Sequence, residues 1–150
     1  RIHNLVYELK ITNANISILE KNQSEIFWNK IKTLEFFHSS KNNIFRIVIP
    51  PSECIKLIYQ FSNNFKYYLD WGGALIWVEA FEMSELMFES IKRRVVKLGG
   101  YMTMIKNSDY LTYVEDVFTI NKDRFNMSQN IKKSFDPKKI LNPGKMYSGI

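Results

Sequence analysis

The chain has 150 residues, of which 45% are hydrophobic and 24% charged, and its formal net charge is +6. This size and composition predict one globular domain, residues 1–150, with a sizeable core. The sequence holds no apolar run of the roughly 20 residues that cross a bilayer and no secretory leader, so we expect a cytoplasmic protein that reaches a membrane only through a partner. The single cysteine, Cys54, excludes an internal disulfide.

Hydrophobic spacing and turn residues predict helices and strands in alternation. In chain order they are a helix within 1–12, a strand near 15–19, a helix capped by Ser24, a strand at 44–49, a helix after Pro50 and Pro51, strands at 66–71 and 74–79, a helix capped by Ser84, a strand at 101–105 and a helix opened by Asn121. The short link Gly72–Gly73 can join only antiparallel strands. The pattern therefore predicts an α+β fold, an antiparallel sheet with helices packed on one face.

Three of these helices carry apolar residues at helical spacing. The helix after the prolines carries Ile55, Ile58 and Tyr59, the helix after Ser84 is expected to turn Met87, Ile91, Val95 and Leu98 inward, and the last helix has Met127, Ile131 and Phe135 on one stripe. Cys54 shares the first of these apolar patterns, which favours a buried thiol. Phe135 is also expected to act as the buried anchor of the segment that follows it.

The positive net charge suits a nucleic acid, an anionic partner or an acidic ligand. The basic clusters at 92–94, 132–133 and 138–139 lie on separate predicted elements, so solvated helix faces explain them better than one binding patch. A strand row of Tyr67, Phe45 and Trp77 would suit base stacking, but core packing is the more common use of such aromatics. A basic, ferredoxin-like nucleic-acid-binding module stays open as an alternative.

No arrangement of side chains in the sequence is typical of a catalytic or metal site. His3 and His38 are far apart and have no nucleophile in a recognisable triad order. Glu115 and Asp116 are adjacent, so their side chains point in different directions on a helix or strand. The sequence therefore gives no catalytic residue and no metal ligand.

The segment 134–147, which reads SFDPKKILNPGKMY, carries the most specific pattern of the chain. Asp136 is predicted to cap the proline turn that follows it, because its carboxylate can accept backbone N–H groups. Residues 142–144 are predicted to form a turn with glycine at a positive φ. This turn would present Asn142 and Lys145 on a rigid corner.

This segment resembles the C-terminal FDP..ILNPGK stretch of the vanillyl-alcohol oxidase type FAD-linked oxidoreductases. Together with Phe27–Trp28, FRIVIP at 45–50 and DWGGALIW at 70–77, it resembles the C-terminal half of the smaller FAD-binding subunit of bacterial glycolate oxidase, over most of the chain. The chain departs from that subunit at three positions. They are Ile76, where the subunit has arginine, and Tyr101 and Lys106, near which it has histidine and arginine.

The resemblance implies a ferredoxin-like cap domain on the substrate side of a flavin. The chain would be a C-terminal fragment, because its glycines form no phosphate loop and the FAD phosphate-binding domain is absent. FAD, bound mainly by that absent domain, would accept hydride from a 2-hydroxy acid, which becomes a 2-oxo acid. The isolated chain is predicted to be inactive. The expected partners are an FAD-binding domain or subunit, other glycolate oxidase-type subunits including an iron-sulfur subunit, and the substrate, but no nucleic acid.

The resemblance places Asn142 and Lys145 near the flavin as cofactor-binding residues. Arg46 is the substrate-binding candidate, because an arginine in an apolar strand is costly to bury unless it pairs with an acidic group such as a carboxylate. Strand alternation that simply points Arg46 to solvent is an equal alternative. A further alternative is a catalytically degenerate cap that acts as a structural or assembly subunit, with the three departures as marks of lost function.

Overall fold

The structure is a computed structural model, and it describes residues 2–10, 16–61, 64–108, 111–145 and 147–148. It divides into two compact units, residues 1–39 and residues 40–150. The assignment of the whole range 1–150 to one cap domain stays a prediction.

The first unit contains α1 (Ile2–Lys10), α2 (Lys21–Lys32) and the short 3₁₀ helix η1 (Glu35–Phe37). The N-cap of α2 is Glu20, whose backbone N–H donates to Oε1 of Gln23 at 3.2 Å. The prediction that Ser24 caps this helix was therefore wrong, because a cap formed earlier in the chain starts the helix. Residues 16–20 carry no regular structure, so they do not form the predicted strand, and Asn15 lies outside the described residues.

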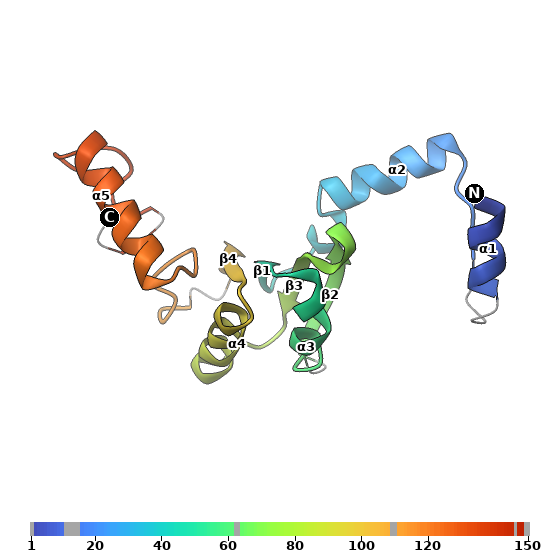
Figure 1. Cartoon of the computed structure of the whole chain (residues 1–150), viewed down its shortest axis with the longest axis horizontal. Coiled ribbons are helices and arrows are strands. Elements are labelled where there is room, and N and C mark those ends of the chain that lie inside the picture. The colour runs from blue at the N-terminus through green and yellow to red at the C-terminus, as the bar shows by residue number, and fades with distance from the viewer. Residues whose placement is uncertain (1, 11–15, 62–63, 109–110, 146, 149–150) are drawn as a thin grey trace. The chain divides into compact units, whose positions relative to one another are not determined.

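The second unit contains a four-stranded sheet and three α-helices (Figure 1). Its elements are β1 (Asn43–Val48), η2 (Pro51–Glu53), α3 (Cys54–Ile58), β2 (Phe65–Asp70), η3 (Trp71–Gly73), β3 (Leu75–Ala80), α4 (Glu85–Lys97), β4 (Tyr101–Lys106) and α5 (Lys122–Phe135). The strand order is β2-β3-β1-β4, and all neighbours are antiparallel. This is the order of the ferredoxin-like split βαβ motif, so the predicted α+β class is confirmed.

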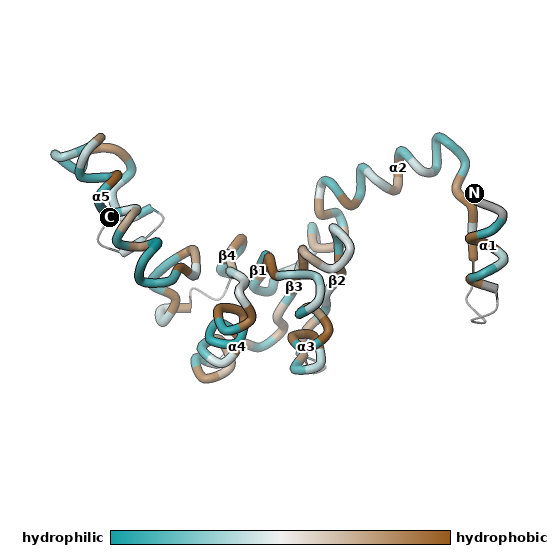
Figure 2. The backbone as a smooth tube through the Cα atoms, in the orientation of Figure 1, coloured by the Kyte–Doolittle hydropathy of each residue, from teal (hydrophilic) through white to brown (hydrophobic). Residues whose placement is uncertain are grey.

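The core lies between the sheet and the helices α3 and α4, which lie on the same side of the sheet (Figure 1). Phe45 of β1 pairs in register with Val78 of β3, and their side chains are 1% and 2% exposed. Leu57 of α3 and Val95 of α4 are both fully buried in the same cluster. Figure 2 shows the alternation of apolar and polar segments along α4 that this one-sided packing requires.

Helix α3 packs only part of its predicted apolar pattern, Ile58, against the core. Cys54 and Leu57 are buried, whereas Ile55 is 52% and Tyr59 84% exposed. The 3₁₀ turn η2 precedes α3 and shifts the helical phase, which the proline signal alone does not reveal. Burial raises the pKa of the Cys54 thiol, as expected for a buried cysteine.

Helix α4 follows the prediction more closely. The Ser84 hydroxyl caps it by accepting from the backbone N–H of Met87 at 3.2 Å. Ile91 and Val95 are buried as predicted, and Phe88 joins them at 4% exposure. The buried face of α4 therefore includes Phe88, a core residue that the sequence pattern did not indicate.

The register of the sheet contradicts the predicted aromatic row. Tyr67 and Phe45 both pair with Val78, so they belong to the face that α3 and α4 cover. Trp77 pairs with Arg46 and therefore belongs to the opposite face. Side chains alternate between the two faces along each strand, and Trp77 is one residue away from Val78, the partner of Tyr67 and Phe45. Trp77 therefore lies on the opposite face from the other two aromatics.

Candidate functional site

The side of the sheet away from α3 and α4, here called the distal face, carries a mixed set of aromatic, apolar and polar side chains. A central row crosses all four strands through Tyr68, Trp77, Arg46 and Thr103, each of which pairs with the next across neighbouring strands. The next row consists of Asp70, Leu75, Val48 and Tyr101. The ferredoxin-like motif thus leaves a four-strand surface that neither of its helices covers.

Arg46 lies near the centre of the distal face and is half-buried. Its Cζ is 5.5 Å from the centre of the Trp71 ring, a cation–π distance. Among the described residues, no Asp or Glu forms an ion pair with Arg46. A partly desolvated guanidinium without a carboxylate partner is a suitable binding group for an external anion.

Two residues in the same row as Arg46 carry hydroxyl groups. The pKa of Tyr68 is raised to about 12, first by burial and then by the nearby charge of Asp70, so its phenol stays neutral at ordinary pH. Thr103 is 6% exposed, and within the described ranges its hydroxyl has no hydrogen-bond partner. Both groups lie in the same row as Arg46.

A buried carboxylate closes one end of the distal face. Glu79 of β3 is 5% exposed, and its Oε1 accepts from the Ser40 hydroxyl at 2.5 Å and from the Asn42 amide at 2.7 Å. Lys106 of β4 donates to the backbone carbonyl of Ser40 at 2.5 Å. These contacts tie the loop before β1 to the sheet, so the role that they indicate for Glu79 is structural.

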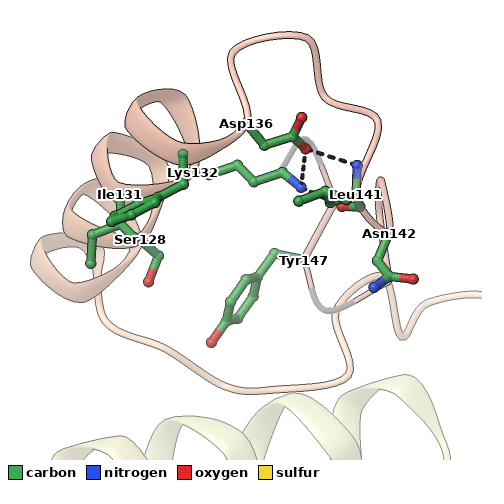
Figure 3. A pocket seen from close by; sticks show the side chains of 8 residues that line it. Ser128, Ile131, Lys132, Asp136, Leu141, Asn142 and Tyr147 are labelled. Carbon is green, nitrogen blue, oxygen red and sulfur yellow. Dashed lines mark hydrogen bonds and ion pairs between the residues drawn. The ribbon is translucent and has the colours of Figure 1, made fainter.

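The C-terminal segment is organised around Asp136, which is 4% exposed (Figure 3). Its carboxylate accepts from Lys132 Nζ at 2.7 Å, from the Ile140 N–H at 3.0 Å and from the Leu141 N–H at 2.9 Å. The hydrogen bond from Lys132 is the main reason that the pKa of Asp136 is lowered to about 2, and the two backbone N–H groups add to it. The predicted cap is thus present, and a lysine on the preceding helix strengthens it.

A pocket of about 460 Å³ lies between α5 and this segment (Figure 3). Its lining consists of Ser128, Ile131, Lys132, Phe135, Asp136, Leu141, Asn142 and Tyr147. Phe135 is 83% exposed, so the prediction that it is a buried anchor was wrong. Within the described part of this segment, the buried residue is Asp136, whose carboxylate accepts local hydrogen bonds, while Phe135 lines the pocket and remains exposed.

The structure brings two of the predicted site residues together and keeps the third apart. Asn142 and Lys145 flank the predicted turn, in which the Lys145 N–H donates to the Asn142 carbonyl at 3.3 Å and Gly144 has a φ of 68°. Both side chains are exposed. Arg46 lies on β1, and in the described residues no hydrogen bond or ion pair connects it to the turn. The assignment of these residues to cofactor and substrate stays a prediction.

The groups of this turn fit only part of an FAD molecule. The Asn142 amide and the Lys145 ammonium can donate to ring carbonyls or to phosphate. A pyrophosphate also needs backbone N–H groups in a close glycine loop. At Gly100 a Cβ would lie 2.5 Å from the Val48 carbonyl, so the lack of a side chain there allows the backbone to pack against β1. The residues of this turn therefore fit a contact with one side of FAD, and Gly100 does not form a phosphate loop.

Sequence reasoning did not find Trp71, Tyr68 or Thr103. A signal for Trp71 existed, since it directly precedes Gly72–Gly73, a pair that marks a turn with unusual backbone angles. The other two needed the register: only the pairing of the four strands shows that they share a row with Arg46.

The described parts of the chain offer no other obvious chemistry. They contain no group of three or more His, Cys, Asp or Glu side chains that could hold a metal ion. The ring of His38 is 2.9 Å from the Thr33 carbonyl, while the His3 side chain lies outside what is described. None of the described helices is both long and apolar enough to span a membrane.

Comparison with known proteins gives one finding. Residues 115–146 match the family model described as FAD linked oxidases, C-terminal domain. This match supports a C-terminal domain of the FAD-linked oxidase family. It covers α5, the Asp136 cap and the Asn142 turn, and it gives an FAD-dependent oxidoreductase context at the level of the family. Neither the curated proteins nor the solved structures yield a match.

Proposed function

We propose that the chain is the substrate-side cap of a glycolate oxidase-like FAD-linked oxidoreductase that converts a 2-hydroxy acid to a 2-oxo acid. The observation that carries this proposal is Arg46, half-buried on the distal face beside Trp71 and without a carboxylate partner in the described chain. A planar guanidinium can bind a carboxylate through two parallel hydrogen bonds. The family match of residues 115–146 supports the redox context.

In this proposal the chain binds and orients, and the cofactor carries the redox chemistry. Arg46 holds the substrate carboxylate, while Trp71 and Trp77 exclude water from the row beside it. When bound, FAD supplies the acceptor for the hydride that leaves C2 of the substrate. Asn142 and Lys145 contact the flavin from the C-terminal turn. The FAD-binding domain or subunit covers the exposed apolar side chains of α5.

Three positions, Ile76, Tyr101 and Lys106, differ from the glycolate oxidase subunit. They do not support the alternative of a degenerate cap to the same degree. Ile76 is fully buried on the side of α3 and α4, so its replacement of an arginine leaves the distal face intact. Tyr101 and Lys106 both lie on β4, and Lys106 is engaged with the Ser40 carbonyl. The alternative of lost function therefore depends on the β4 positions alone.

The direct test is flavin reduction in the natural full-length protein, purified with the subunits that accompany it. Anaerobic mixing with glycolate or lactate should bleach the visible absorbance of oxidised FAD at a rate no slower than kcat. Bound FAD that no 2-hydroxy acid reduces would contradict the oxidoreductase proposal and favour the structural subunit. The purification also tests the proposed partners, because an FAD-binding partner and an iron-sulfur subunit should co-purify and nucleic acid should not.

Arg46→Met should lower kcat/KM about ten- to hundred-fold, the loss expected for a charge-assisted hydrogen bond of about 1.5–3 kcal/mol. Arg46→Lys should recover part of this loss, because it keeps the charge without the two-pronged geometry. Arg93→Met is the matched control, since Arg93 is an exposed cation on α4. Equal effects of Arg46→Met and Arg93→Met would show that net charge, not the site, is responsible.

A further inference from the structure

The backbone at Trp71 adopts a conformation that bulky side chains rarely take. Its φ is 53°, and Gly72 and Gly73 follow with φ of 62° and 93°. Left-handed backbone at a non-glycine residue is strained, and such residues concentrate at ligand sites. The Trp71 side chain is 60% exposed, so burial of the indole does not compensate for this backbone.

Local hydrogen bonds hold the Trp71 turn in place. The Trp71 N–H donates to Oδ1 of Asp70 at 2.7 Å, and the Trp71 carbonyl accepts from the Ala74 N–H at 3.2 Å. The turn sets the indole 5.5 Å from the Arg46 guanidinium. The exposed ring therefore has a defined position next to the anion-binding candidate.

Aromatic rings surround Arg46 on more than one side. Trp77 is its direct partner on β3, and Tyr68 is the partner of Trp77 on β2. Directly paired residues on adjacent strands have Cβ atoms about 4.5–5.5 Å apart, so these side chains share one patch. The phenol of Tyr68, with a pKa of about 12, adds no negative charge to repel an anion. A carboxylate on Arg46 would place the rest of its molecule against apolar ring surfaces.

We propose that the distal face selects 2-hydroxy acids with an aromatic or large apolar group on C2, and that Trp71 positions Arg46 and forms one wall of this subsite. This inference rests on the proposed oxidoreductase function and narrows its substrate class. Glycolate carries no side chain that could contact these rings. In the proposed reaction the C2–H bond would break with its electron pair passing as hydride to bound FAD, the hydroxyl proton would pass to solvent, and a C2=O bond would form.

The test compares substrates in the natural full-length protein with bound FAD. Mandelate and 3-phenyllactate, each as both enantiomers, are measured against glycolate and lactate. We expect kcat/KM for the better aromatic acid to exceed that for glycolate at least ten-fold. Equal or better turnover of glycolate would overturn the aromatic preference but leave the oxidoreductase function standing.

A binding measurement separates failure of the preference from failure of the reaction. Phenylacetate and acetate lack the 2-hydroxyl group and cannot be oxidised at C2, so each can be titrated while the visible spectrum of the bound flavin is recorded. Phenylacetate should perturb the spectrum at a concentration at least ten-fold lower than acetate. This result without oxidation of any 2-hydroxy acid would refute the proposed function but keep the aromatic subsite. No difference between the two anions would overturn the subsite.

Variants at Trp71 distinguish a positioning role from a structural one. Trp71→Gly removes the ring and also relieves the backbone, since glycine tolerates a φ of 53°. It should fold at least as well as the parent, yet raise KM for phenyllactate at least ten-fold with little change in kcat. Trp71→Phe should restore most of the affinity, and Trp28→Phe, a change in α2, should have no effect. Unchanged KM in Trp71→Gly would overturn the role of Trp71.

Discussion

Helices α4 and α5 are similar in length and in their N-terminal caps but differ in the side chains that they bury. They have 13 and 14 residues, and each begins at a side-chain cap, Ser84 in α4 and Asn121 in α5. Helix α4 buries Phe88, Ile91 and Val95, whereas α5 has no buried residue. The comparison teaches that caps and apolar spacing determine where a helix forms, while the neighbouring surface determines whether its apolar stripe becomes core.

The largest expected effect comes from removing one phenylalanine from each helix. Phe88→Ala should destabilise the protein by about 3–5 kcal/mol, because Phe88 is 4% exposed and its ring packs against Phe45. Phe135→Ala should change the free energy of unfolding by less than about 0.5 kcal/mol, since Phe135 is 83% exposed. Denaturant unfolding measures both. Comparable losses for the two variants would show that α5 is packed in solution.

A second prediction concerns two glycines, Gly100 after α4 and Gly144 in the segment after α5. Gly100→Ala should cost about 1–3 kcal/mol, because the new Cβ would lie 2.5 Å from the Val48 carbonyl, a backbone atom that cannot move alone. Gly144→Ala meets no atom within 4 Å, so only its φ of 68° opposes alanine and the effect should stay local to the turn. Denaturant unfolding should separate the two, and a stable Gly100→Ala variant would contradict the close packing.

The two caps provide a smaller and closely matched pair. Ser84→Ala should lower global stability by about 1 kcal/mol, because α4 forms part of the core. Asn121→Ala removes an equivalent bond to the Arg124 N–H, which is 2.9 Å long, but should mainly fray α5. Thermal unfolding reports the first effect and hydrogen exchange in the first turn of α5 the second. A global loss in Asn121→Ala as large as that in Ser84→Ala would refute this division.

The smallest effect is confined to the C-terminal segment and depends on pH. Folding lowers the pKa of Asp136 to about 2 from an ordinary value of 3.8, so the folded segment favours the ionised carboxylate. Its stabilisation is present above about pH 4 and is lost as the pH falls toward 2. Hydrogen exchange of the Ile140 and Leu141 amides should accelerate across this range. In Asp136→Asn the exchange should already be fast at neutral pH and show no such transition.

The sequence predicted the elements of the sheet module well because their signals are local. The two-glycine link between β2 and β3 permits only an antiparallel pair, and the Ser84 cap starts α4 where the pattern predicts it. The helix from Asn121 and the turn at residues 142–144 also follow from cap and turn chemistry. Errors occurred where a local signal was ambiguous, as for α3, whose phase depends on a short 3₁₀ turn.

The candidate site was predicted only in part. The sequence singled out Arg46, Asn142 and Lys145, but not the side chains that surround Arg46. Strand register makes Trp77 the direct partner of Arg46 and places Tyr68 next in the same row, a relation between residues more than twenty positions apart. The hydrophobic pattern of a single strand does not show which residues of other strands it pairs with. The predicted row of Tyr67, Phe45 and Trp77 therefore mixed the two faces of the sheet.

The sequence by itself determined the α+β class, the caps of α4 and α5, the turn at residues 142–144, and the Asp136 segment, which lies within the match to the FAD-linked oxidase family model. These features depend on contacts between residues close in the chain, which composition and spacing encode directly. Only the tertiary structure decided that Phe88 is buried and Phe135 exposed, and that Arg46 shares a face with Trp71 and Trp77. The physical reason is that burial and register depend on which surfaces meet, and distant segments of the chain supply those surfaces.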